Sequence, residues 1–247
     1  MGLEVKIVPD NAALAHTAAL EFHRLAEAAV RERGRFSVAL SGGNTPRTVY
    51  SLLASEHRQL PWDGIHVFFG DERHVPPDDP DSNFRMASES LLSKVPIPQK
   101  NVHRIRAELD AEAAAKEYEQ ELRGFFHLID HDWPRFDLVL LGLGVDGHTA
   151  SLFPGSKALT EASSRVAANW VEKIQAFRIT LTLPAINHAA EVLFLVSGAS
   201  KAQILSDVLR PGARKYPAQS VQPENGRLFW LADQDAGSLL RFATPKP

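Results

Sequence analysis

The chain has 247 residues, of which 44% are hydrophobic, and this length is sufficient to bury one large core. A net charge of −3 and dispersed cationic residues exclude a basic nucleic-acid surface and a polybasic membrane patch. The absence of cysteine excludes disulfides, thiolate metal sites and a cysteine nucleophile, and is typical of a reducing compartment.

The amino-terminal segment does not resemble a targeting sequence. Glu4 and Asp10 stand where a signal peptide needs a basic start followed by an apolar run. Lys6 stands where the myristoylation pattern needs Ser or Thr, and every apolar stretch is far shorter than the ~20 residues that span a bilayer. We therefore expect a cytoplasmic protein without membrane or nucleic-acid partners, either a monomer or a weak homo-oligomer.

Short, nearly continuous apolar runs alternate with longer stretches of helical periodicity along the chain. The predicted strands are 4–8, 36–40, 65–69, 136–141, 178–183, 192–196 and 228–231. The predicted helices are 11–33, 45–54, 110–128 and 199–209. Continuous apolar strands are typical of a parallel sheet that helices cover on both faces. The order predicts an α/β fold, a three-layer α/β/α sandwich with a doubly wound, mainly parallel sheet, formed by residues 1–247 as one domain.

Residues that follow the predicted strands are the candidates for function, because ligands of open parallel sheets bind beyond the carboxyl ends of the strands. The first such segment, SGGNTP, precedes a predicted helix. Gly42 and Gly43 allow the backbone to approach a ligand closely, and Ser41 and Thr45 add hydroxyl groups. The N–H groups at the start of the helix favour a phosphate. An ordinary capped turn is the alternative, since the Gly-Lys-Ser/Thr ending of a P-loop is missing.

The segment GDERHVP, residues 70–76, directly follows the apolar run 65–69. Acidic and basic residues gathered at the end of such a strand indicate that some of them point into a cleft. Asp71 is one candidate, and Arg73 suits the clamping of an anion or a carbonyl group. A solvated, salt-bridged turn is the alternative interpretation.

The segment DPDSN, residues 79–83, begins like a calcium-binding loop. Phe84 and Ser90 occupy the positions where such a loop requires Gly and Glu, so we exclude calcium. Asn83 is interpreted instead as a helix cap or as a side chain that orders the loop.

The segment GLGVDGH, residues 142–148, follows the strand predicted at 136–141 and contains the pattern G-x-G-x-x-G. A dinucleotide site also requires a long helix after this pattern, and Pro154 interrupts one. The glycines are better explained as exposing Asp146 and His148 at the end of the strand. Imidazole, with an ordinary pKa near ~6.5, is the usual general base at neutral pH, and a carboxylate two residues away could orient it.

The segment SGASK, residues 197–201, again places small residues between a strand and a helix. Lys201 lies in the first turn of that helix, where the helix dipole disfavours a cation. A bound phosphate would offset this cost, and an ordinary surface lysine is the alternative.

With these segments in hand, the sequence resembles the 6-phosphogluconolactonases, within the wider glucosamine-6-phosphate isomerase/lactonase superfamily. The matching motifs are SGGNTP (41–46), GDERHVP (70–76), SN (82–83), LGLGVDGHTASLFP (141–154), LPAIN (183–187) and GASK (198–201). The resemblance implies a Rossmann-like, NagB-like fold without a bound nucleotide. It implies hydrolysis of 6-phospho-D-glucono-1,5-lactone to 6-phospho-D-gluconate, the second step of the oxidative pentose phosphate pathway, with no metal and no organic cofactor.

The resemblance also suggests a role for each candidate residue. His148 would act as the general base that activates water, with support from Asp146. Positive charge from Arg73, helped by backbone N–H groups of the glycine loops, would stabilise the oxyanion or grip the substrate. Asp71 and Asn83 would line the sugar site. The phosphate would be held by Ser41, Gly42, Gly43, Thr45 and Lys201.

Three other functions remain open at this point. An amino-sugar phosphate isomerase/deaminase of the same superfamily would carry a Phe-Asn-Glu-Pro-type sequence where this chain has TASLFP, residues 149–154. A non-catalytic sugar-phosphate sensor would need an added DNA-binding module, and this acidic chain enters its first strand by about Glu4. A dehydrogenase would have to bind NAD(P)H.

Overall fold

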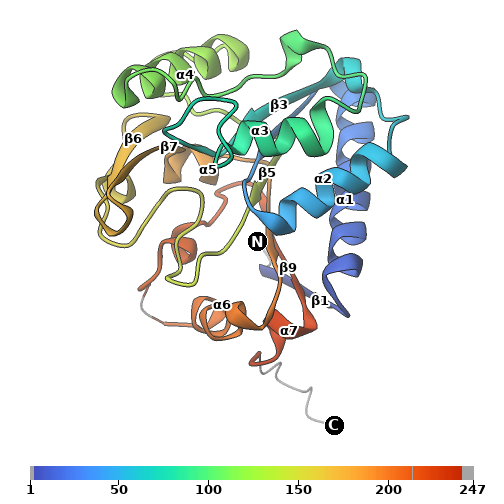
Figure 1. The fold of residues 1–247 in the computed structure, drawn as a ribbon, viewed down its shortest axis with the longest axis vertical. Helices are drawn as coiled ribbons and strands as arrows, with labels where there is room; N and C mark the ends of the chain where they lie inside the picture. Colours follow the sequence, from blue (N-terminus) through green and yellow to red (C-terminus); the bar gives the residue numbers. More distant parts are fainter. Residues whose placement is uncertain (1–2, 213, 241–247) are drawn as a thin grey trace.

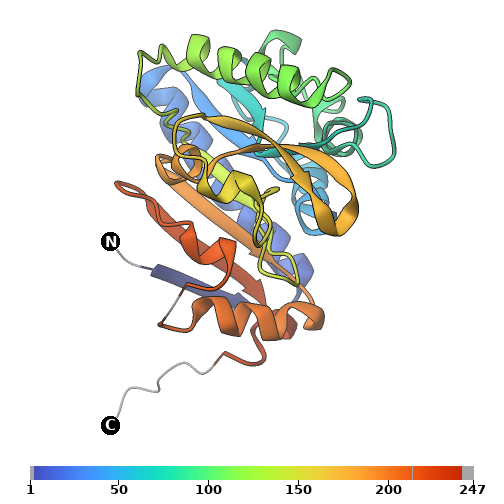
Figure 2. The same cartoon turned by 90° about the vertical axis from the view of Figure 1, so that its left-hand side faces the viewer.

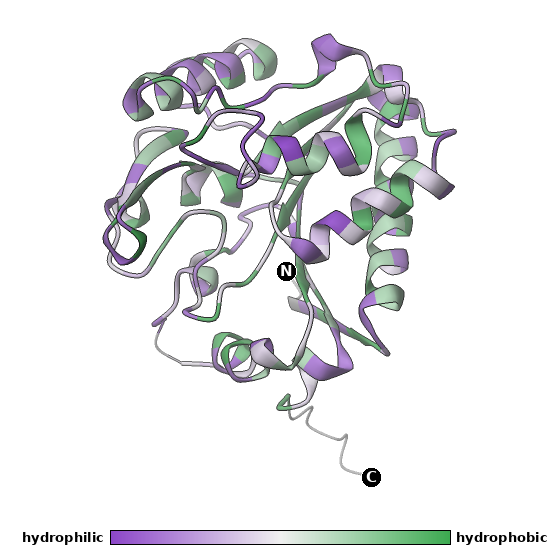
Figure 3. Cartoon of the chain, viewed as in Figure 1, coloured by the Kyte–Doolittle hydropathy of each residue, from purple (hydrophilic) through white to green (hydrophobic). Residues whose placement is uncertain are grey.

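Six parallel strands form the central sheet of the protein. The structure is a computed structural model that describes residues 3–212 and 214–240. Every neighbouring pair in the sheet is parallel. Across the sheet the order is β1 (Leu3–Val8), β9 (Arg227–Asp233), β8 (Glu191–Val196), β5 (Leu138–Leu141), β2 (Phe36–Leu40) and β3 (Ile65–Phe69). All residues of β2, β5 and β8 are buried, and Figure 3 shows the central strands as mainly hydrophobic.

Helices cover both faces of this sheet, with α1 and α2 on one face and α5 and α6 on the other (Figure 1). Asp10 is the N-cap of α1, because its Oδ1 accepts a hydrogen bond from Ala13 N at 2.8 Å. The helices are α1 (Asn11–Arg33), α2 (Asn44–Glu56), α3 (Asn83–Ala87), α4 (Ala111–Phe126), α5 (Leu183–Asn187), α6 (Ala202–Leu209) and α7 (Gln234–Gly237). None of the helices in the described ranges is long and apolar enough to cross a bilayer. The predicted fold class is confirmed, while the ends of the predicted domain 1–247 lie outside the described residues.

A second, smaller sheet was not predicted. It contains three antiparallel strands in the order β4 (Asp71–Arg73), β7 (Ala176–Leu181) and β6 (Val166–Val171). Helix α4 packs against β6 and β7, and Figure 2 shows it lying across them. The assignment of residues 178–183 to the parallel sheet was therefore wrong, because an apolar run does not reveal with which strand it pairs.

The winding direction of the chain changes between β2 and β5. From β2 the chain continues to β3 at one edge, whereas from β5 it continues to β8 and β9 toward the other edge. Since β2 and β5 are neighbours, the segments that leave their carboxyl ends diverge and open a crevice between them. The glycine-rich segments 41–43 and 142–148 leave the sheet at this point.

Candidate active site

A cavity of about 250 Å³ lies at this change of winding direction. Its lining combines the ends of β2 and β5 with residues of the second sheet and with the end of the β8–α6 connection. The predicted site residues that line it are Ser41, Gly42, Asp71, Arg73, Asn83, His148 and Lys201.

Three predicted site residues are not in the lining of this cavity. Gly43 is the exposed N-cap of α2, with a positive φ of 105°, and Thr45 is half-buried in the first turn of that helix. Their contact with phosphate stays a prediction. Asp146 stands behind His148, on the side away from the cavity lining.

Asp146 and His148 are in direct contact. Asp146 Oδ1 lies 2.5 Å from His148 Nδ1, and Asp146 Oδ2 accepts a hydrogen bond from Lys173 Nζ at 2.8 Å. Partial burial opposes ionisation, but the hydrogen bonds from Lys173 and His148 outweigh it and hold the pKa of Asp146 well below its usual range. An ionised carboxylate can only accept hydrogen bonds, so the contact assigns a proton to Nδ1, and in the neutral form of the ring Nε2 then has the free electron pair.

In the loop 142–148, the imidazole ring of His148 occupies the space that a side chain at position 144 would need. A Cβ atom on Gly144 would lie 2.1 Å from His148 Nδ1, so only glycine leaves room for the ring at this position. Gly144 N donates to His148 O at 2.8 Å, and Gly147 N donates to Gly144 O at 2.9 Å. Those two N–H groups are thus used inside the loop, and the expectation that N–H groups of the glycine loops help to stabilise an oxyanion stays a prediction for the others.

The opposite face of the imidazole is covered by Phe153. The two ring centroids are 4.1 Å apart, with an interplanar angle of 23°. Phe153 directly precedes Pro154, the residue that interrupts the long helix required by a dinucleotide site. In the structure, this same segment holds the histidine ring in place. With Gly144 on one side and Phe153 on the other, His148 has little freedom to turn.

A buried hydrogen-bonded group around Asp71 forms another part of the cavity lining. Asp71 Oδ2 accepts a hydrogen bond from Ser151 Oγ at 2.6 Å, and Asn83 Nδ2 donates to Asp71 O at 2.9 Å. The cap of α3 is Ser82, whose Oγ accepts from Arg85 N, so the expectation that Asn83 is a cap was wrong. Its role in ordering the loop fits the contacts.

Glu72 holds this wall together and does not point into the cavity. Its carboxylate accepts hydrogen bonds from the backbone N–H groups of Asn83 at 2.7 Å and Phe84 at 2.8 Å. Burial raises the pKa of Glu72, and these hydrogen bonds oppose the rise. By tying β4 to the start of α3, Glu72 places Asn83 beside Gly42, where a Cβ atom would lie 1.9 Å from Asn83 Oδ1.

Three cations face the cavity: Arg73, Arg178 and Lys201. Burial lowers the pKa of Arg178, assisted by the neighbouring charge of Arg73, which is its register partner across β4 and β7. Burial also lowers the pKa of Lys201, against the charge of Asp146. The guanidinium hydrogen bonds of Arg73 and Arg178 in the described structure go to the backbone carbonyls of Asp81 and Phe177. Cations that are desolvated in this way favour an anionic ligand.

Sequence reasoning missed Arg178 and Ser151. Arg178 was placed at the start of a predicted strand, and its signal was a charged residue beginning an otherwise apolar run. Ser151 gave no signal of its own, because its partner Asp71 lies far away in the sequence. Within the described residues, no group of three or more His, Asp and Glu side chains is arranged to hold a metal ion.

Comparisons with known proteins show what the whole chain is similar to. Residues 9–230 match the family model of glucosamine-6-phosphate isomerases/6-phosphogluconolactonase. The chain is 49% identical to a 6-phosphogluconolactonase of Synechocystis sp. over 86% of this chain and 88% of that protein. It is 44% identical to one of Nostoc sp. over 96% and 98%. The solved 6-phosphogluconolactonase of Trypanosoma brucei superposes with a TM-score of 0.88 at 30% identity, covering 97% of this chain and 99% of that chain.

Proposed function

Because this chain belongs to the glucosamine-6-phosphate isomerase/6-phosphogluconolactonase family and hydrolyses 6-phosphogluconolactone in the pentose phosphate pathway, we propose that His148 is the general base of that hydrolysis. The observation that carries the proposal is the contact between Asp146 and His148 Nδ1 at the edge of a cavity that three cations face. A neutral imidazole with its Nε2 electron pair available is the form that a general base needs.

In the proposed reaction, His148 Nε2 takes a proton from a water molecule as the water oxygen forms a bond to the lactone carbonyl carbon. The tetrahedral intermediate then breaks the bond between that carbon and the ring oxygen. The imidazolium returns its proton to the departing ring oxygen, which becomes the hydroxyl group of 6-phosphogluconate. Asp146 accepts the Nδ1–H hydrogen bond throughout and stabilises the positive charge that the ring carries between the two proton transfers.

The substrate has two sites of negative charge, the phosphate and the oxyanion that develops on the carbonyl. Ser41, Gly42 and Lys201 are proposed to bind the phosphate, together with the amino end of the 13-residue helix α2. Arg73 and Arg178 add positive charge from the second sheet. Asp71 and Asn83 are proposed to bind sugar hydroxyl groups.

An assay on the lactone tests this function directly. The 1,5-lactone is generated in situ by enzymatic oxidation of glucose 6-phosphate, and its disappearance is followed with and without the protein. We expect the protein to accelerate the disappearance at neutral pH, in the presence of a metal chelator as well as in its absence. Release of ammonia from glucosamine 6-phosphate, with no effect on the lactone, would instead support the isomerase/deaminase reaction. The carboxylate that lines the cavity is Asp71, and the loop after His148 carries no glutamate for that chemistry.

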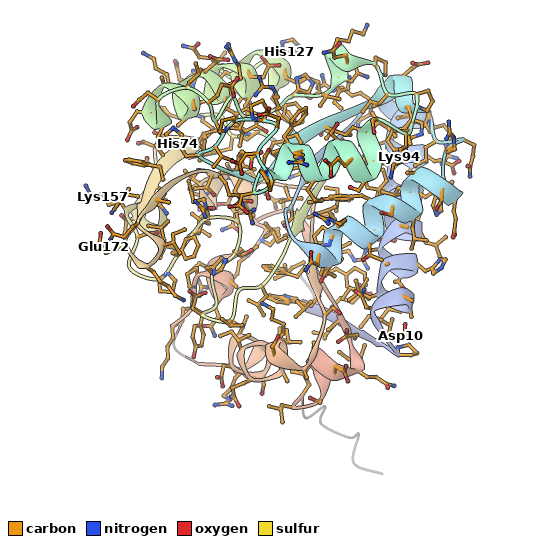
Figure 4. All side chains as sticks on the ribbon, viewed as in Figure 1. Asp10, His74, Lys94, His127, Lys157 and Glu172 are labelled. Carbon is orange, nitrogen blue, oxygen red and sulfur yellow. The ribbon has the colours of Figure 1, made fainter. Side chains whose placement is uncertain are left out.

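Lys201→Ala is expected to raise KM about tenfold or more and to leave kcat within about twofold. The reason is that a half-buried ammonium group, already desolvated, loses little on binding a phosphate and gives a charge-assisted hydrogen bond. Steady-state kinetics provide the measurement, and inhibition by inorganic phosphate should weaken in parallel. Lys94→Ala, at the exposed position labelled in Figure 4, is the control and should behave as wild type. A change in kcat alone would place Lys201 at the carbonyl group.

A further inference from the structure

Lys173 lies outside the lining of the catalytic cavity but touches the catalytic pair. It is part of the short 3-10 turn Glu172–Ile174, which connects β6 to β7 at the end of the second sheet. Its Nζ atom donates to Asp146 Oδ2 at 2.8 Å, across 27 positions of sequence. The second sheet therefore reaches the catalytic pair from behind.

We propose that Lys173 is a positioning residue for the hydrolysis, which fixes the Asp146 carboxylate so that it holds His148 with Nε2 toward the substrate. This proposal rests on the proposed role of His148 as the base. Lys173 touches neither the substrate nor the reacting atoms, and it acts only through Asp146.

The two carboxylate oxygens of Asp146 have different partners. Oδ1 is used within the loop, since it contacts His148 Nδ1 at 2.5 Å and accepts from His148 N at 3.3 Å. Oδ2 accepts from Lys173, and this is the bond that ties the carboxylate to a different element of the structure. Without it, rotation of the carboxylate about its last side-chain bond would be opposed only by contacts inside a glycine-rich loop.

Exposure decides what this ion pair contributes. The Lys173 side chain is 64% exposed and the Asp146 side chain 21%, so solvent screens the pair and it adds little to the stability of the fold. The orientation of Asp146 is a separate matter, because a misplaced catalytic group costs activity without unfolding the protein. The effect of Lys173 is therefore expected in turnover and not in thermal stability.

A second cavity, of about 590 Å³, lies behind the catalytic pair and gives water access to it. Asp146 and Lys173 line this cavity, and Phe153 lines both cavities. Loss of the ammonium group would therefore let water compete for Asp146 Oδ2. Lys157 and Glu172 also line the second cavity, and Figure 4 shows them together at the edge of the molecule.

Charged groups line both cavities beside the pair. Around the catalytic cavity these are Arg73, Asp71, Arg178 and Lys201, and around the second cavity they are Glu112, Lys157, Glu172 and Lys173. Lys173 is the cation joined to the pair by a hydrogen bond. Removing Lys173 should therefore take away this hydrogen bond while leaving the charges that line the catalytic cavity unchanged.

The test compares Lys173→Met and Lys173→Arg with Lys157→Met, which removes a lysine from the same second cavity. For Lys173→Met we expect kcat to fall about tenfold and KM to stay within about twofold. Lys173→Arg should restore most of the activity, because it can donate to the same oxygen. Lys157→Met should match wild type.

A spectroscopic measurement separates this inference from the proposed function. Nitrogen-15 NMR of labelled histidine reports which ring nitrogen carries the proton, whether or not the enzyme turns over. We expect the Nδ1–H form of His148 in wild type and a mixture of the two neutral forms in Lys173→Met. Wild-type kinetics and an unchanged tautomer in Lys173→Met would overturn the role of Lys173, as would an equal loss of activity in Lys157→Met. An inactive wild type with the expected tautomers would overturn the proposed function alone.

Discussion

His148→Gln is expected to lower kcat by about 10²–10⁴-fold, the range that general base catalysis contributes, and to leave KM within a fewfold of wild type. The glutamine amide cannot take a proton from water near neutral pH, yet it keeps a polar group of similar length at the position. The cations that are proposed to bind the substrate remain in place, and so binding should persist. Stopped-assay or coupled kinetics on the 1,5-lactone generated in situ provide the measurement.

The control for this variant must show that the fold is intact. The His148 ring stacks on Phe153 but is partly exposed, with about 30% of its side chain accessible, so its loss should lower the melting temperature only slightly. His16→Gln, at an exposed position of α1, serves as the matched histidine control and should keep full activity. A folded His148→Gln protein with near-normal turnover would remove His148 from the mechanism.

Gly144→Ala is expected to lower kcat about 100-fold although the new methyl group carries no charge. Its Cβ would lie 2.1 Å from His148 Nδ1, and the ring cannot retreat easily because Phe153 covers its other face. The ring must therefore move, and the Nδ1 contact with Asp146 is lost with it. A displacement of about 1 Å in a catalytic group can cost about 10² in rate.

Gly124→Ala provides the comparison for this prediction. Gly124 lies in α4, and a Cβ atom there meets nothing within 4 Å, so the substitution should leave activity unchanged and raise stability by about 0.5–1 kcal/mol. Melting temperatures and kcat measured side by side distinguish a displaced ring from general unfolding. If Gly144→Ala kept wild-type kcat, the position of the imidazole would not limit the reaction.

Much of the scaffold could be predicted from the sequence because its signals are local. Continuous apolar runs fix the central strands, and Asp10 and Asp110 mark the starts of α1 and α4 as N-caps. The ends of β2 and β5 were predicted to carry function, and the structure brings them together because these strands are neighbours. The proposed catalytic pair, Asp146 and His148, could be predicted to be neighbours since they are two residues apart in a glycine-rich loop.

What the sequence did not reveal depends on pairing between distant segments. The strand β4 has three charged residues and no apolar pattern, and only its pairing with β7 makes it a strand. Lys173 and Arg178 reach the site from the β6–β7 hairpin, whose position follows from that pairing. From the sequence, Gly144 was interpreted as exposing its neighbours. In the structure, glycine is needed at this position because the His148 ring occupies the space that a Cβ atom would take.

The proposed base and several residues that are proposed to contact the substrate come from different parts of the fold. The loop after β5 of the parallel sheet carries the proposed base, whereas β4 and β7 contribute Asp71, Arg73 and Arg178 to the cavity. Substitutions at the cavity-lining positions 71, 73 and 178 can therefore alter which sugar phosphate is preferred while the buried residues of β7, such as Ile179 and Leu181, keep the core packed. A library confined to these three positions would explore new specificities while Lys173 and the central strands stay as they are.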